Sequence, residues 1–205
     1  MHSAGGSDMK IVAASSNKNK IIEIKDKFSG IPELEIIPLS EYNNVPEIIE
    51  DGDTFLANAI KKAKIIRDFT GEITIADDSG LVVDFLNGEP GVYSARYGGE
   101  NLTDIDRYNL ILEKMSGVEF DKRTARFICE IVIAFPDGRI ITAAGACEGM
   151  ITYESAGTKG FGYDPIFYLP EFKSTMAEIS LTEKNKISHR GKALEAAYKL
   201  FLDEV

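Results

Sequence analysis

The sequence is poor in the residues that build metal clusters and disulfide frameworks. Its 205 residues include only two cysteines, Cys129 and Cys147, and two histidines. The cysteines form no Cys-x-x-Cys pair and stand beside no histidine cluster, which argues against zinc. They flank a turn at Pro136–Gly138, and neither a two-residue nor a three-residue loop there would set the sulfurs opposite each other. We therefore expect reduced, buried thiols.

Positive charge is also scarce. Lysine and arginine number 23 against 33 aspartates and glutamates, which gives a formal net charge of −10. Proteins that bind a nucleic acid polymer neutralise its phosphates with lysine and arginine, so this balance argues against such a partner. A small anionic substrate remains compatible if cations gather around it locally.

Long apolar runs and low-complexity tracts are absent as well. No apolar stretch approaches the thickness of a bilayer, and no charged-then-apolar leader opens the chain. We therefore expect a cytoplasmic protein with no membrane partner. Residues 1–8 are small, polar and unpatterned, as in a tag remnant or loose tail. We expect residues 9–205 to form a single domain, long enough for two lobes with a real core.

The central stretch, Ile75–Leu81, begins as a buried strand and then presents Asp77, Asp78 and Ser79 side by side. A short strand that breaks into acidic residues is how α/β proteins present ligands to a hard cation at a strand's C-terminal end. Asp, Ser and Gly are equally the residues of a plain turn. This stretch alone leaves the metal site and the turn both open.

A second polar loop, Ser15–Lys20, follows the expected strand Lys10–Ala14 and leads into a helical pattern. A helix start in this position directs free N–H groups and a positive dipole at an anion, and Lys20 would add a point charge for phosphate. The Gly-x4-Gly-Lys spacing of a Walker loop is absent. An ordinary helix capped by Ser or Asn explains the same residues, and on this loop alone it is the favoured interpretation.

The next elements are a strand at Leu34–Pro38 and a helix opened by Asp53 and Thr54. The buried stripe of this helix should comprise four residues at helical spacing: Phe55, Ala59, Ala63 and Ile66. Three lysines on the same helix are most simply a solvated face: Lys61, Lys62 and Lys64. Glu50, just before the helix, either supplies a carboxylate to the metal at Asp78 or complements the helix dipole.

Farther along, the pattern predicts a helix at Thr103–Met115, with Thr103 as its N-cap and Asp106 completing a weaker capping box. Two long strands, Arg123–Phe135 and Arg139–Glu148, form a hairpin about the proline-containing turn. Because both faces of these strands carry apolar residues, we expect both faces to be covered.

Two further segments favour a ligand over a purely structural role. In Gly157–Pro165, glycines flank Phe161, so the backbone could approach a planar ligand while the ring stacks on a base; a bulge or tight loop is the alternative. Before the final helix, which Ser188 should cap, His189 and Arg190 lie where the helix dipole disfavours cations. That placement favours an anion or a polar base nearby over a solvent-exposed pair.

Six segments occur in one order along nearly the whole chain from Met9: Ser15–Lys20, Glu50–Phe55, Ala76–Leu81, Pro90–Arg96, Gly160–Pro165 and Glu183–Leu194. In this order they resemble the inosine triphosphate pyrophosphatase family, house-cleaning enzymes for non-canonical purine nucleotides. The resemblance implies a two-lobed α/β homodimer with a long mixed β-sheet flanked by helices and a substrate cleft between the lobes. It also implies Mg2+ and hydrolysis of dITP, ITP and XTP to the nucleoside monophosphate and pyrophosphate.

The resemblance also assigns site residues. Glu50 and Asp78 would bind Mg2+, and Asp78, with Asp77 beside it, would orient or deprotonate the attacking water. Ser79 would touch the substrate. The phosphates would be held by Ser15, Ser16, Asn17, Lys18, Asn19 and Lys20. The base would be packed by Phe161, Gly162, Tyr163 and Asp164, and its polar edge would be read by Lys184, His189 and Arg190.

The chemistry of these residues agrees with that assignment. A metal ion with lysine and arginine is the expected apparatus for stabilising charge at phosphorus, and a carboxylate beside the metal can position water. Donors facing O6 would favour a 6-oxo purine, because buried polar groups left unpaired against the wrong base reject it strongly.

One position departs from the family pattern. Where the family usually reads Thr-Phe-x-Glu-Asn-Ala, this chain has Ala57 in place of the glutamate, which either weakens metal binding or changes nothing. Two alternatives therefore stay open: a protein that binds purine nucleotides without turnover, and a pyrophosphatase for other modified or pyrimidine nucleotides. Pyrophosphate release, compared among nucleotides, separates all three.

Overall fold

The structure is a computed structural model that describes residues 9–99 and 101–205. The expected tail at residues 1–8 lies outside this description. The chain divides into two compact units. The first comprises the described residues up to Asp78 with residues 130–144 and 193–205, and the second comprises Ser79–Cys129 and Gly145–Lys192.

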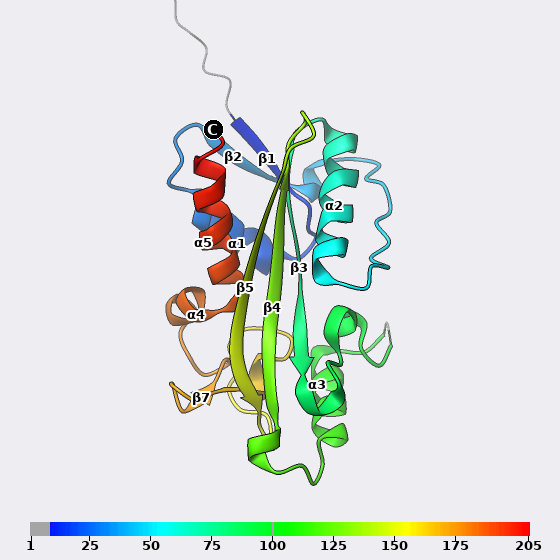
Figure 1. The fold of residues 1–205 in the computed structure, drawn as a ribbon, viewed down its shortest axis with the longest axis vertical. Coiled ribbons are helices and arrows are strands. Elements are labelled where there is room, and N and C mark those ends of the chain that lie inside the picture. The colour runs from blue at the N-terminus through cyan, green and yellow to red at the C-terminus, as the bar shows by residue number, and fades with distance from the viewer. Residues whose placement is uncertain (1–8, 100) are drawn as a thin grey trace, which may run out of the picture. The chain divides into compact units, whose positions relative to one another are not determined.

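Seven strands form one mixed sheet in the order β2-β1-β3-β4-β5-β6-β7 (Figure 1). Both β2 and β3 run parallel to β1, whereas β6 is antiparallel to β5 and to β7. The strands are β1 (Met9–Ala13), β2 (Leu34–Pro38), β3 (Ile73–Val83), β4 (Thr124–Ala134), β5 (Ile140–Ile151), β6 (Phe167–Leu169) and β7 (Ser174–Thr175). The expected α/β fold with a mixed sheet is confirmed, as are the strands predicted before and after the first helix.

The course of β3 corrects the prediction for the central stretch. The strand runs without interruption through Asp77, Asp78 and Ser79, so it neither ends nor turns there. Because side chains alternate along a strand, the two aspartates point to opposite faces. Lys20 forms an ion pair with Asp77, and the Asn58 side chain donates a hydrogen bond to Asp78. Each carboxylate thus finds a partner inside the fold, and the backbone continues as a strand.

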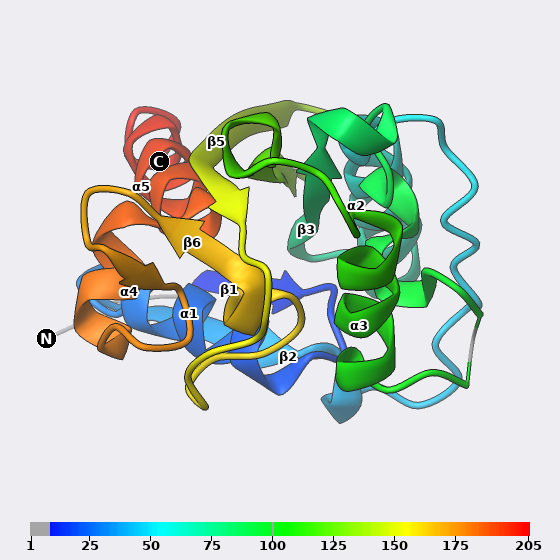
Figure 2. The ribbon, with the colours of Figure 1, turned by 90° about the horizontal axis from the view of Figure 1, so that it is seen from below.

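In the first unit, α1 (Lys18–Phe28) and α2 (Phe55–Thr70) cover different faces of the strands (Figure 1). The predicted stripe of α2 is confirmed, since it packs in one core cluster with residues of β1, β3 and β4: Val12, Ala59, Ala63, Ile66, Ala76 and Val132. The last helix, α5 (His189–Leu202), lies beside α1 (Figure 2). Phe28 contacts Tyr198 and Phe201 edge-on, with ring centroids 5.6 and 5.8 Å apart.

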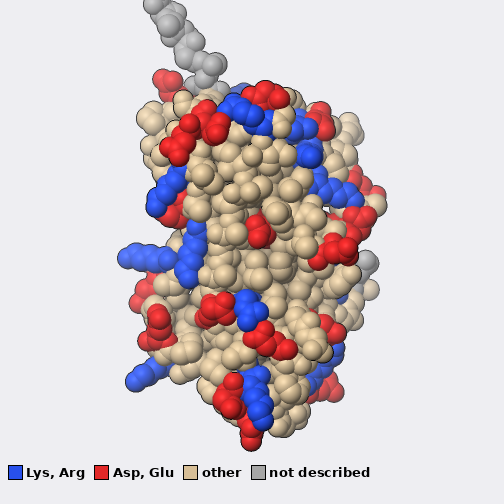
Figure 3. Space-filling model, in the orientation of Figure 1, with Lys and Arg blue, Asp and Glu red and all other residues tan. Residues whose placement is uncertain are grey.

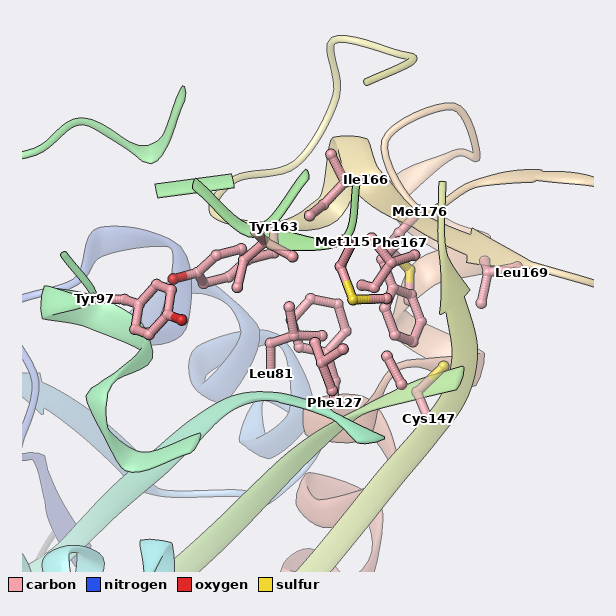
Figure 4. Close-up of a cluster of buried hydrophobic side chains, with 14 of the residues drawn as sticks. Leu81, Tyr97, Met115, Phe127, Cys147, Tyr163, Ile166, Phe167, Leu169 and Met176 are labelled. Carbon is pink, nitrogen blue, oxygen red and sulfur yellow. The ribbon is translucent and has the colours of Figure 1, made fainter. Parts of the chain in front are cut away.

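The second unit contains α3 (Asp104–Lys114) and α4 (Leu181–Ile187). The capping box of Thr103 and Asp106 on α3 is confirmed. Helix α4 was not expected, because seven residues are too few to show a helical period, although Ser180 and Glu183 form a second capping box there. The core of this unit is a cluster of apolar side chains from the strands, α3 and the loops (Figure 4); it includes Leu81, Met115, Phe127, Cys147, Tyr163 and Phe167.

The described residues also form short 3-10 helices: η1 (Leu39–Glu41), η2 (Asp84–Leu86), η3 (Gly91–Arg96), η4 (Phe120–Lys122) and η5 (Asp164–Ile166). No helix in the described part of the chain is long and apolar enough to cross a membrane. Cys129 and Cys147 are buried free thiols, as predicted.

The hairpin of β4 and β5 is confirmed by the bond from the Phe135 N–H to the Arg139 carbonyl, 2.9 Å long. The expectation that both of its faces are covered is wrong for β5. Thr142, Ala144 and Ala146 alternate with buried neighbours and are exposed. Each of these small side chains exposes little apolar area. Leaving this face uncovered therefore costs less free energy than the apolar content of the strands suggested.

Candidate active site

The polar loop after β1 ends in a capped helix. The Asn17 Oδ1 accepts hydrogen bonds from the N–H groups of Asn19 (2.9 Å) and Lys20 (3.4 Å). The Ser15 Oγ accepts one from the Asn17 N–H at 3.1 Å. These three N–H groups are engaged within the loop, and the prediction of an ordinary cap is confirmed. Lys20 adds a positive charge beside the loop.

Lys20 pairs with the first aspartate of β3. Its Nζ lies 2.9 Å from the Asp77 Oδ2, and only 2% of the Asp77 side chain and 16% of the Lys20 side chain are exposed. Because little water screens such a pair, its two charges hold each other strongly in place. The ammonium group is thereby fixed beside Asp77.

Asn58 ties three segments together. Its Nδ2 donates to the Asp78 Oδ2 at 3.0 Å, and its Oδ1 accepts from the Gly52 N–H at 2.8 Å. A side chain at Gly52 would bring a Cβ within 2.7 Å of that Oδ1, so glycine is required for this close approach. The loop that carries Glu50 is therefore fastened to α2 and to β3.

Lys62 lies in this cluster and not on a solvated face. Its Nζ pairs with Glu50 and donates to the Asp77 carbonyl oxygen at 3.0 Å, and only 12% of its side chain is exposed. The prediction of a solvated lysine is therefore wrong for this residue. The spacing along the helix indicated this position, because Lys62 follows Asn58 by four residues and so lies on the same helix face. Lys61, in contrast, pairs with Asp51 at the surface.

The charges of this cluster act on one another. Burial raises the pKa of the Asp78 carboxyl above its ordinary value, and the charge of Glu50 raises it further, whereas Lys62, Asn58 and Lys20 oppose the rise. Lys62 pairs with Glu50, which also acts on Asp78, whereas Lys20 pairs with Asp77. Across residues 9–99 and 101–205, no three His, Cys, Asp or Glu side chains gather as a metal cluster. Two protein carboxylates are thus what the cluster offers to a cation.

The second unit holds a separate cluster around Phe161. The Lys184 Nζ lies 4.6 Å from the centre of the Phe161 ring, and the Arg190 Cζ lies 5.8 Å from it. Lys184 also pairs with Asp164 at 2.5 Å, and Arg190 donates to the Ser79 Oγ at 2.9 Å. Lys184, Asp164 and Arg190 are all at least 95% buried, which concentrates polar groups and charge beside one aromatic ring.

The loop that carries Phe161 folds around its own carboxylate. The Phe161 N–H donates to the Asp164 Oδ2 at 2.9 Å, the same oxygen that pairs with Lys184. Gly160 has a φ of 76°, and a Cβ there would come within 2.0 Å of that oxygen, so no other residue fits. Gly160 thus permits a tight loop, the alternative that the sequence had left open.

Two predicted base-site residues are buried around this loop. The Tyr163 ring lies in the core cluster (Figure 4), its hydroxyl donates to the Ser94 carbonyl oxygen at 2.8 Å, and burial raises its pKa. His189 stacks on Phe127 with ring centroids 4.7 Å apart. His189 and Arg190 are therefore not a solvent-exposed pair, and that alternative is wrong.

The structure thus gathers the predicted residues into two sets. The first unit holds one set on the N-terminal loop, the Glu50 loop and β3: Ser15, Ser16, Asn17, Lys18, Asn19, Lys20, Glu50 and Asp78. The second unit holds the other: Ser79, Phe161, Gly162, Tyr163, Asp164, Lys184, His189 and Arg190. Sequence reasoning missed Asn58 and Lys62, although both follow Thr54 at four-residue steps on one helix face.

The chain is similar to known proteins along most of its length. The Ham1 family pattern matches residues 11–200. A dITP/XTP pyrophosphatase of Desulforamulus reducens is 50% identical over 192 residues, which are 94% of this chain and 95% of that protein.

Solved structures give the same answer. The HAM1 protein from Coxiella burnetii superposes with a TM-score of 0.88 at 41% identity, covering 95% of this chain and 99% of that one. The Staphylococcus aureus Ham1 protein superposes with a TM-score of 0.87 at 40% identity, covering 96% of this chain and all of that one. The similarity in sequence and the similarity in structure both extend over most of the chain. The chain therefore belongs to the Ham1 family.

Proposed function

We propose that this protein is a nucleoside triphosphate pyrophosphatase. It hydrolyses the non-canonical purine nucleotides dITP, ITP and XTP to the nucleoside monophosphate and pyrophosphate. The observation that carries the proposal is the buried Asp78, held by Asn58 and flanked by Glu50, Lys20 and Lys62. The name borne by the relative that shares half of its residues with this chain supports the choice of substrate.

The donor set of the first unit fits Mg2+. Carboxylate oxygens are the ligands that this hard cation prefers, and Mg2+ commonly takes only one or two carboxylates, completing its shell with water and substrate phosphates. Glu50 and Asp78 supply those two. When bound, Mg2+ would supply charge neutralisation at the phosphates.

Three residues of the protein have further roles in this reaction. The Asp78 carboxylate, whose pKa burial raises, accepts a proton more readily than an exposed one and so orients or deprotonates the attacking water. Lys20 and Lys62 stabilise the negative charge of the phosphates. Hydrolysis between the α- and β-phosphates adds water across one phosphoanhydride bond, and pyrophosphate leaves.

The second unit is suited to the base. Phe161 offers a ring face for stacking, and Lys184 and Arg190 place N–H donors beside it. Lysine and arginine donate hydrogen bonds and cannot accept them. They therefore suit the O6 of hypoxanthine or xanthine and match the amino group of adenine poorly.

The test is a comparison of ITP, XTP, dITP, GTP, ATP and UTP at equal Mg2+, with both products identified. We expect nucleoside monophosphate and pyrophosphate, with the 6-oxo purines preferred at least tenfold in kcat/KM over ATP and UTP. Release of orthophosphate would contradict the proposed bond cleavage. Binding of ITP without turnover would favour a nucleotide-binding protein and direct attention to Ala57.

We also propose a homodimer, as the resemblance implies. The exposed side of β5 in the first unit carries small uncharged side chains, Thr142 and Ala144. The upper part of the face in Figure 3 is mostly uncharged, whereas acidic and basic residues gather in its lower part. Uncharged surface of this kind is typical of a contact between copies. Light scattering measures the mass in solution, and a monomer mass would contradict the dimer.

A further inference from the structure

The loop that carries Phe161 is held at three successive residues. The Phe161 N–H is bound by Asp164, and the Tyr163 hydroxyl is bound by Ser94. The residue between them, Gly162, donates its N–H to the Asp104 Oδ2 at 2.8 Å. Asp104 lies 58 residues earlier in the chain, in none of the motifs that pointed to the function.

Asp104 is itself fixed in place. It is the first residue of α3, where the helix dipole favours a negative charge. Its Oδ1 accepts from the Arg107 Nη1 at 3.3 Å, with 12% of the Arg107 side chain and 54% of the Asp104 side chain exposed. The charge of Arg107 also reaches Tyr163, the residue after Gly162. One carboxylate thus joins the first turn of α3 to the loop.

We propose that Asp104 is a positioning residue that sets the Phe161 ring for the purine base. This inference rests on the proposed function. Gly162 has a φ of 62°, in the left-handed region, and a bound N–H keeps its peptide in one orientation. A charge-assisted bond to a carboxylate is stronger than a bond between neutral groups, so it limits the motion of the residue next to Phe161.

The consequence for kinetics is specific. Contacts with the base are remote from phosphorus and are made equally in the bound substrate and in the transition state. Weakening them therefore raises KM and leaves kcat nearly unchanged. A residue that only stabilised the fold would lower the amount of active protein, and so lower the apparent kcat with KM unchanged.

Three variants test this role with ITP as substrate. Asp104→Ala removes the acceptor, and we expect KM to rise about fivefold with kcat within about twofold of the wild type. Asp104→Asn keeps an oxygen acceptor for the Gly162 N–H but not its charge, so its KM should lie between those of the wild type and Asp104→Ala. Asp106→Ala is the matched control: it lies in the same helix turn, bonds only within the capping box at Thr103, and should lower stability without changing KM.

The following results would overturn the positioning role of Asp104 or the proposed function. A wild-type KM in Asp104→Ala, or an equal rise in Asp106→Ala, would overturn the positioning role while the proposed function stands. Equal KM values for Asp104→Asn and Asp104→Ala would also overturn it. Failure of the wild type to release pyrophosphate from ITP would instead overturn the proposed function, and this inference with it.

Discussion

At the scale of single residues, Lys62 is the side chain whose role the structure changes most. It lies between Glu50 and the carbonyl of Asp77, in a site where little water competes for its charge. We expect Lys62→Met to lower kcat/KM for ITP about a hundredfold, because it removes a cation beside the phosphates and keeps most of the apolar stem. The measurement is the initial rate of pyrophosphate release.

Lys64→Met is the control for that variant. Lys64 lies two residues farther along the same helix and is exposed. Its replacement should change kcat/KM by less than about twofold, as for most surface substitutions away from a site. Similar rates in the two variants would show that Lys62 has no part in the chemistry.

At the scale of elements, Arg123 joins the end of α3 to the start of β4 and the end of β5. Its guanidinium donates to the carbonyl oxygens of Met115 (2.6 Å), Ile151 (2.8 Å) and Thr152 (2.6 Å), and the residue is 1% exposed. Arg123→Met removes a donor from each of these three oxygens, and the Met115 oxygen still accepts from the Val118 N–H at 3.2 Å. We expect the free energy of unfolding to fall by about 3 kcal/mol or more.

Urea denaturation with an unchanged m-value measures this loss. Arg126→Met serves as the comparison, since Arg126 pairs with Asp84 and Glu148 at the surface with 32% of its side chain exposed. That change should cost less than about 1 kcal/mol. If both variants unfold at the same urea concentration, the carbonyl contacts of Arg123 contribute nothing particular to stability.

Elements defined by neighbouring residues were predictable from the sequence. The stripe of α2, the capping box at Thr103 and the hairpin of β4 and β5 depend on local spacing. The uninterrupted course of β3 was not predictable, because it depends on partners that the fold brings to Asp77 and Asp78 from α1 and α2. The bond from Gly162 to Asp104 spans 58 residues and left no local signal.

At the scale of the whole molecule, the charge distribution reconciles an acidic protein with an anionic substrate. The chain carries a net charge of −10, yet each unit buries two cations at its candidate site. These are Lys20 and Lys62 in the first unit and Lys184 and Arg190 in the second. A small anionic substrate is compatible with an acidic chain if cations gather around it locally. In this fold each of the four cations has a partner that holds it in place.

The most direct test of the proposed function is Mg2+-dependent pyrophosphate release from ITP by the wild type and by Asp78→Asn. The substitution keeps the size of the side chain and an oxygen for Asn58, but it removes the charge that we propose binds metal and orients water. We expect turnover by the wild type and a loss of at least about a hundredfold in the variant, with unfolding at a similar urea concentration. Undiminished turnover by Asp78→Asn would contradict the role given to this carboxylate and to the site built around it.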